Sequence, residues 1–282
     1  MTLAAVLLVI SSAFLHASWN AILKRVREPE VAVLSMITIG STTAVIVALV
    51  LGVPFPPTTS FLWSLLAGVL ESGYLLTLAK ALSRAPLGPV YTIARGGALL
   101  VVWPTSIIFL GEQITLTRIG GTLLVLAGLT ATGFQQRAKA DEKRDRSGFF
   151  WAAICAVFVG SYHLAYKLAL AKGGNPPAAD AISLSAATVV NFAFAGVVKG
   201  RQAFVALRRD PFRIISGGVL ANLSFLLFLF AMAQGGAGVL LTLRNTSILF
   251  AQAFAFFLGE RPTRLGIIGA VLVTIGAVLL AR

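Results

Sequence analysis

Two of the most apolar stretches of the chain carry polar side chains at helical spacing. In FLHASWNAILK, His16, Trp19 and Asn20 follow the spacing i, i+3, i+4, so they share one face of a helix. The stretch VFVGSYHLAYK repeats this arrangement in the second half of the chain, with a stripe made of Tyr162, His163 and Tyr166. Lipid solvates imidazole, amide and phenol groups poorly, so both stripes are expected to line a wet central path. The alternative is hydrogen bonding between helices with no role for a substrate.

Arg95 and Arg244 are the costliest residues within the apolar segments, because an arginine at the centre of a membrane helix costs about 2.5 kcal/mol or more. The matching positions of acid and amide side chains suggest compensation by a Glu71–Arg95 pair and an Asn222–Arg244 pair. Paired arginines would link neighbouring helices and have a structural role. An arginine left partly free would instead hold a substrate carboxylate through a bidentate contact.

The elements that must position these residues are membrane helices. The chain has 282 residues, of which 57% are hydrophobic and 12% charged, and this is too apolar for one water-soluble core. The apolar runs have the length of roughly 20 residues that a helix needs to cross a bilayer, and they lack the alternation of barrel strands. They predict ten transmembrane helices near residues 2–23, 31–52, 60–83, 87–109, 115–134, 148–171, 179–198, 212–233, 237–258 and 264–281.

The chain divides into two similar halves. Residues 1–134 and 148–282 each contain five predicted helices, and the basic, hydrophilic segment 135–147 links them. The motif Leu-Gly-Glu ends the fourth predicted helix at Glu112 and the ninth at Glu260. Since an odd number of helices inverts the second copy in the membrane, the sequence predicts an all-α membrane protein with two inverted five-helix repeats around a central cavity.

The net charge of +13 is spread over short loops and forms no basic face, so it does not indicate nucleic-acid binding. The basic loops, including the linker 135–147, follow the odd-numbered predicted helices and therefore share one side of the membrane. The positive-inside rule places these loops in the cytoplasm and both termini outside.

No motif in the sequence indicates an enzyme. The chain lacks the phosphate-binding glycine loop of an ATPase and the patterns HExxH and GxSxG, and its two histidines and single Cys155 make no metal site. No cofactor is expected. Glu112 and Glu260 are interpreted as helix caps or contacts to the next helix, because each falls at a helix end beside a glycine.

Several segments resemble the EamA-type exporters of the drug/metabolite transporter superfamily, which have ten helices in two five-helix repeats. The resemblance is carried by HASWNAILK, YLLTLAKALSRAPLGPVYTIARGG and LGEQITLTRIGGTLLVLAG in the first half and by FLLFLFAMAQGGAGVLLTLRNTSILFAQAFAFFLGERPTRLGIIGAVLV in the second. It implies a multi-pass carrier of the bacterial inner membrane that exports small metabolites, including amino acids in several relatives, through a cavity between the halves. Arg95 and Arg244 depart from the pattern, since many relatives carry uncharged residues or proline nearby.

The residues and the resemblance together predict a secondary carrier that exports amino acids with aromatic or other apolar side chains by alternating access. Its partners would be this small-molecule substrate and the lipid bilayer, and a monomer suffices because both repeats lie on one chain. The alternatives are an exporter of hydrophobic cations or drugs, which requires an exposed Glu71, and a non-transporting membrane scaffold or small intramembrane enzyme. The predicted substrate-binding residues are His16, Trp19, Asn20, Tyr74, Tyr91, Arg95, Tyr162, His163, Tyr166 and Arg244.

Overall fold

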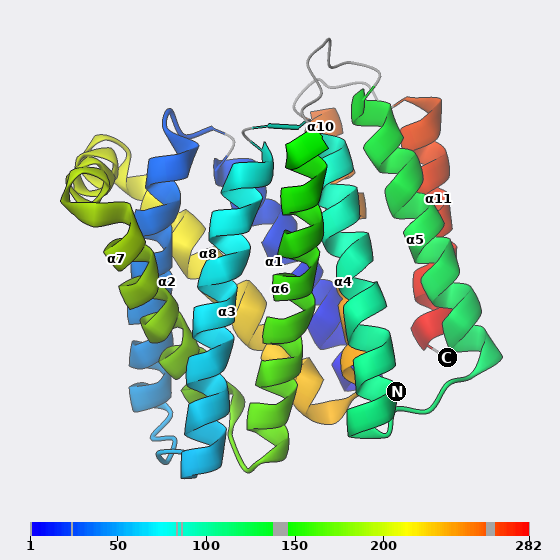
Figure 1. Cartoon of the computed structure of the whole chain (residues 1–282), viewed down its shortest axis with the longest axis horizontal. Helices are drawn as coiled ribbons and strands as arrows, with labels where there is room; N and C mark the ends of the chain where they lie inside the picture. The colour runs from blue at the N-terminus through cyan, green and yellow to red at the C-terminus, as the bar shows by residue number, and fades with distance from the viewer. Residues whose placement is uncertain are drawn as a thin grey trace.

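The computed structural model describes residues 2–23, 25–82, 84–85, 87–137, 146–257 and 263–281, which fold as helices joined by short connections (Figure 1). The helices are α1 (Leu3–Leu23), α2 (Pro29–Val50), α3 (Thr58–Leu82), α4 (Leu87–Leu110), α5 (Leu116–Arg137), α6 (Arg146–Ala171), α7 (Pro176–Arg209), α8 (Pro211–Gln234), α9 (Ala237–Arg244), α10 (Ser247–Phe257) and α11 (Arg264–Ala281).

The helices have the length and surface of membrane spans. Seven of them, α1, α2, α3, α4, α6, α7 and α8, are long and apolar enough to cross a bilayer, and α5 and α11 contain shorter apolar segments. Large apolar side chains such as Leu49 and Ile108 are 75% and 71% exposed, which a water-soluble monomer would not sustain over so much of its surface. The all-helical membrane class predicted from the sequence is therefore confirmed.

The predicted boundaries need three corrections. The helix expected at 179–198 extends to Arg209, because a second helical segment follows Gly196, whose φ of 69° and ψ of 178° kink the chain. The helix expected at 237–258 is interrupted at Asn245 and Thr246, which separate α9 from α10. Of the predicted linker, residues 135–137 belong to α5 and 146–147 to α6, and 138–145 lie outside the described residues.

The helices pack in pairs that join the first half of the chain to the second. Helix α3 packs along α6 and α7, while α1 and α2 pack along α8, and α2 also packs along α7. Helix α4 contacts α6, and α1 contacts both α9 and α10. In chain order, α1, α2 and α3 of the first half correspond to α6, α7 and α8 of the second, and α4 corresponds to α9 and α10. Replacing each helix by its counterpart in the other half gives the same set of pairs. The packing is thus reciprocal between the halves.

Close backbone contacts occur where small residues face each other. On α1 and α8, the hydroxyl of Ser12 donates to the carbonyl of Ser224 at 2.6 Å, and the hydroxyl of Ser224 donates to the carbonyl of Ser12 at 2.9 Å. On α5 and α11, a Cβ added at Gly128 would lie 2.6 Å from the carbonyl oxygen of Gly269. Such approaches are typical of packed membrane helices, in which small residues bring backbones together.

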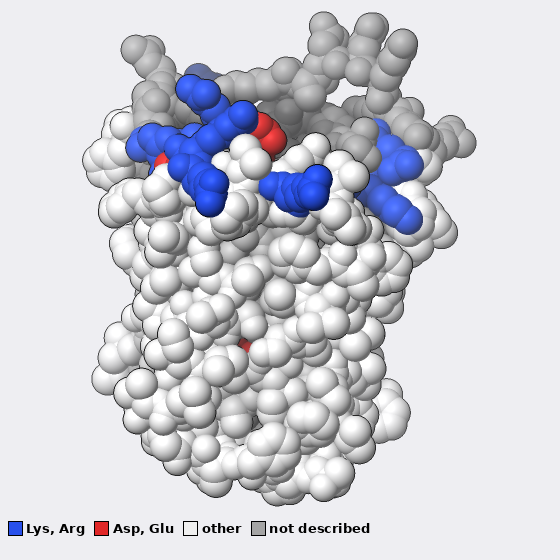
Figure 2. Space-filling view, turned by 90° about the vertical axis from the view of Figure 1, so that its left-hand side faces the viewer, with Lys and Arg blue, Asp and Glu red and all other residues white. Residues whose placement is uncertain are grey.

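Exposed lysines and arginines gather at one end of the molecule, here called the basic end (Figure 2). It includes Arg25, Arg27, Lys80, Arg84, Lys199, Arg201, Arg208, Arg209 and Arg213. Both chain ends lie toward the opposite end in Figure 1. The clustering of basic residues at one end agrees with the sequence pattern, and the side of the membrane that this end faces stays a prediction.

Candidate substrate-binding cavity

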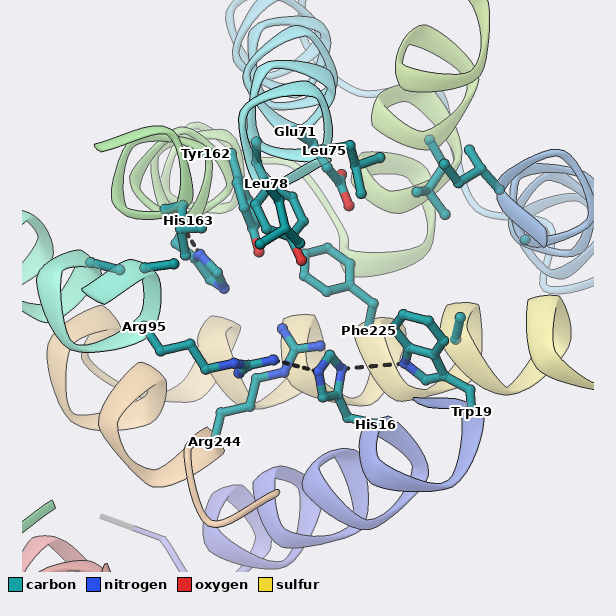
Figure 3. Close-up of a pocket in the computed structure, with 18 of the residues that line it drawn as sticks. His16, Trp19, Glu71, Leu75, Leu78, Arg95, Tyr162, His163, Phe225 and Arg244 are labelled. Carbon is teal, nitrogen blue, oxygen red and sulfur yellow. Dashed lines mark hydrogen bonds between the residues drawn. The ribbon is translucent and has the colours of Figure 1, made fainter. Parts of the chain in front are cut away.

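A cavity of about 150 Å³ lies between the two halves of the chain (Figure 3). Its lining comes from α1 to α4 of the first half and α6 to α9 of the second. On α1 to α4 the lining residues fall in the part of each helix nearer the basic end, so the cavity extends from mid-depth toward that end. A cavity needs a volume of roughly 15 Å³ to hold one water molecule, so this cavity has room for a small metabolite.

One wall of the cavity carries Arg95, His16 and Trp19 (Figure 3). Nη2 of Arg95 lies 2.6 Å from Nε2 of His16, and the indole nitrogen of Trp19 lies 3.3 Å from Nδ1 of the same imidazole. A guanidinium only donates, so Nε2 of His16 must accept from it. A neutral imidazole accepts at one nitrogen only. The indole of Trp19 needs the tautomer in which Nδ1 accepts, whereas Arg95 needs the one in which Nε2 accepts. The shorter contact favours the tautomer that accepts from Arg95. His16 thereby orients a cation toward the cavity.

Arg244, the last residue of α9, lies on the same side of the cavity. Its guanidinium carbon lies 4.9 Å from the ring centre of Phe225 and 4.4 Å from that of Phe228, so two aromatic faces hold the group in place. The side chain is buried, and its Nε has no hydrogen-bond partner among the described residues. The carboxyl end of α9 adds a partial negative charge near this arginine. Arg244 is thus a pre-oriented, desolvated hydrogen-bond donor.

The opposite wall carries hydrogen-bond acceptors and aromatic rings (Figure 3). Glu71 reaches the cavity from α3, and its Oε2 accepts a hydrogen bond from the hydroxyl of Tyr166 at 3.2 Å. Nδ1 of His163 donates to the carbonyl of Val159 at 2.7 Å, which leaves Nε2 as an acceptor without a partner in the described part of the chain. The ring of Tyr162 stacks on His163 with centroids 4.1 Å apart.

Most of the predicted binding residues line this cavity: His16, Trp19, Tyr74, Arg95, Tyr162, His163 and Arg244. Three others differ. The amide of Asn20 donates to the backbone carbonyl of His16 at 2.7 Å, and this residue is not part of the lining. Tyr166 is fully buried behind the wall, where its hydroxyl contacts Glu71 and Ser183. The side chain of Tyr91 lies outside the described part of the structure.

The predicted hydrogen-bonded pair of Asn222 and Arg244 does not form. The amide nitrogen of Asn222 donates instead to Oδ2 of Asp180 at 2.6 Å, and Oδ1 of Asn222 has no partner among the described residues. Glu71 accepts a hydrogen bond from Tyr166 and Arg95 donates to His16, and the Glu71–Arg95 pair stays a prediction. Asp180 was not predicted as a site residue, although an acid inside the apolar run of α7 is a signal of the same kind as Glu71.

At the end of the molecule opposite the basic end, side chains from α6 and from the segment after α4 contact the connection between α8 and α9. The ammonium of Lys167 donates to the carbonyls of Met232 and Gly235 at 2.7 and 2.6 Å. The carboxylate of Glu112 accepts from the backbone amides of Ala237 and Gly238, so it caps α9 from a distant part of the chain. Glu112 is therefore a helix cap, but it caps α9 of the other half and not the helix end at which it falls, and Glu260 lies outside the described residues.

The fold and the cavity define a multi-pass α-helical membrane protein with a polar internal site between two halves. Residues 146–282 match the model of the EamA-like transporter family, part of the drug/metabolite transporter superfamily. One crystal structure of a protein 19% identical in sequence has a TM-score of 0.79 and is aligned over 99% of this chain and 96% of that one, so the two share the fold. No curated protein matches significantly. The second half of the chain, residues 146–282, is therefore similar to the EamA-like transporter family, which suggests a membrane transporter of small molecules.

Proposed function

We propose that the protein is a secondary carrier that exports amino acids with apolar or aromatic side chains from the bacterial cytoplasm. The observation that carries this proposal is the polarity of the cavity. Two guanidinium groups, from Arg95 and Arg244, face a wall that offers the carboxylate of Glu71 and the free nitrogen of His163. A zwitterion satisfies both walls at once, since its carboxylate pairs with an arginine and its ammonium with the acceptors.

The rings in the cavity favour an apolar side chain on this zwitterion. Tyr74 and Tyr162 lie with centroids 5.9 Å apart, and Phe225 lies 6.3 Å from Tyr162, so the lining presents adjacent aromatic faces. Such surfaces bury an apolar or aromatic group favourably and do not need it to carry charge. Hydrophobic cations and drugs fit less well, because Arg95 and Arg244 repel a positive charge that enters without a carboxylate.

Alternating access is supported by the packing of the halves and by the position of the cavity. The reciprocal helix pairs are those expected of inverted repeats, which move as two units around a central site. The cavity extends toward the basic end, while Lys167 and Glu112 hold the other end closed. With the basic end in the cytoplasm, this arrangement is the state that loads substrate for export. The protein works as a monomer in this scheme.

Transport of a panel of radiolabelled amino acids into proteoliposomes tests the proposal. We expect saturable exchange of amino acids with apolar and aromatic side chains, and weaker or no exchange of cationic dyes. The variant Trp19→Ala removes an aromatic group from the cavity and should reduce exchange at low substrate concentration, whereas Phe194→Ala, on a side chain 71% exposed on α7, should not. Movement of cationic dyes without movement of amino acids would overturn the proposal.

A further inference from the structure

A second buried carboxyl group lies directly behind the cavity wall. Asp180 of α7 is fully buried, and its only side-chain hydrogen bond among the described residues is the one that Oδ2 accepts from Asn222 of α8 at 2.6 Å. Asn222 is 2% exposed and lines the cavity, so it separates Asp180 from the substrate space. The proposed substrate site does not use this pair.

Both residues retain an acceptor oxygen that has no donor. Oδ1 of Asp180 and Oδ1 of Asn222 are both buried, and neither has a hydrogen-bond partner in the ranges that the structure describes. An ionised carboxylate at this place would be held by a single amide, which does not offset a desolvation cost of several kcal/mol. One proton on the carboxyl group resolves the conflict, because it removes the charge and turns an acceptor oxygen of Asp180 into a donor.

Charged and titratable groups on the neighbouring helices face Asp180, and they determine how its protonation responds to a bound substrate. From α3, Glu71 adds negative charge, and from α6 the hydroxyl of Tyr166 links Glu71 to Ser183, whose own hydroxyl bonds the backbone carbonyl of Asp180. From α9, Arg244 supplies the positive charge. Helix α2 has no ionisable residue between Val31 and Val50. The positive charge that could balance an ionised Asp180 therefore lies across the cavity, on Arg244. A substrate that binds in the cavity changes this electrostatic balance.

From this geometry we infer that the Asp180–Asn222 pair is a proton-binding site that couples the carrier to the proton gradient. This inference rests on the proposed transport function. In the empty carrier, Asp180 holds the proton. When a zwitterion enters, its carboxylate occupies the arginines and its ammonium lies on the acceptor wall beside Asn222, where it stabilises ionised Asp180. The proton then leaves through the cavity water, so substrate and proton bind alternately and cross the membrane in opposite directions.

Proteoliposomes with an acidic lumen test the coupling. A proton antiporter accumulates substrate in the more acidic compartment, so wild-type protein should concentrate a labelled amino acid inside. In Asp180→Asn the amide supplies the missing donor permanently, and the ratio of gradient-driven accumulation to exchange at equal pH should fall at least tenfold. The control Asp210→Asn changes an acid at the start of α8, paired with Arg213 at 2.8 Å, and should keep the wild-type ratio.

The outcomes separate the inference from the function on which it rests. Exchange that ignores the pH gradient, accumulation that follows a sodium gradient at equal pH, or full coupling in Asp180→Asn would each overturn the proton site and leave the carrier function intact. A wild-type protein that exchanges no amino acid would remove both. A measurement on unmodified protein adds an independent check: in weak buffer with a pH indicator, substrate binding should release about one proton per molecule, and no release would contradict the inference.

Discussion

At the scale of residues, the two arginines are not equivalent despite their matching positions in the sequence. Arg95 is engaged by His16 at 2.6 Å, while Arg244 lies between Phe225 and Phe228 and keeps Nε without a partner among the described residues. A planar guanidinium held on aromatic faces is pre-organised for a carboxylate, and a lysine at this place would keep the charge but lose both the fork and the stacking. Arg244 is thus the better candidate for the carboxylate contact.

Arg244→Lys should weaken substrate binding without unfolding the protein. Loss of a charge-assisted hydrogen bond removes about 1.5–3 kcal/mol, so the half-saturating concentration for exchange should rise about tenfold or more. The measurement is concentration-dependent exchange, together with thermal stabilisation of purified protein by substrate. Arg209→Lys, at the exposed ion pair with Glu28, is the control and should behave as wild type. An unchanged half-saturating concentration in Arg244→Lys would remove this residue from the site.

At the scale of elements, the pairing of α5 with α11 depends on close backbone contacts. Gly121 and Gly128 of α5 face Gly276 and Gly269 of α11, where an added Cβ would lie 2.6 to 2.9 Å from a carbonyl oxygen. By contrast, a Cβ added at Gly120, one residue from Gly121, would meet nothing within 4 Å. Neighbouring glycines of one helix therefore have different roles, which their shared residue type does not reveal.

Gly128→Ala should destabilise the protein, because the added methyl group forces α5 away from α11 at a typical overpacking cost of about 1–3 kcal/mol. Gly120→Ala should be neutral or stabilising, since alanine is the better helix former by about 1 kcal/mol. Thermal unfolding of both variants in the same mild detergent makes the comparison. Equal unfolding temperatures would show that this contact does not limit stability.

At the scale of the whole molecule, access to the cavity depends on which end is closed. Lys167 of α6 and Glu112, which follows α4, both bond the connection between α8 and α9. Closer to the cavity, the indole of Trp103 donates to the hydroxyl of Thr242 at 3.3 Å. Leu78 lies on the opposite side of the site, in the cavity lining nearer the basic end. The two ends should therefore differ in their accessibility from water.

Single cysteines in a Cys155→Ser background test this difference. A membrane-impermeant thiol reagent applied from the basic end should modify Leu78→Cys and not Thr242→Cys, and from the other side it should modify neither. Adding Glu112→Ala should make Thr242→Cys reactive from that other side, because the capping contact that closes it is gone. Rapid modification of Thr242→Cys from that side with Glu112 intact would contradict the closed state.

Features that depend on local sequence patterns could be predicted without knowing which helices meet. Hydropathy over about 20 residues located the membrane helices, and the polar stripes on α1 and α6 identified much of the cavity lining, because a polar group in lipid needs an interior partner wherever the helix packs. The tertiary structure decided contacts between distant segments. The cap of Glu112 on α9, the bond between Asn222 and Asp180 and the interruption at Asn245 arise from packing between the halves, and neither helical periodicity nor hydropathy encodes which helices meet.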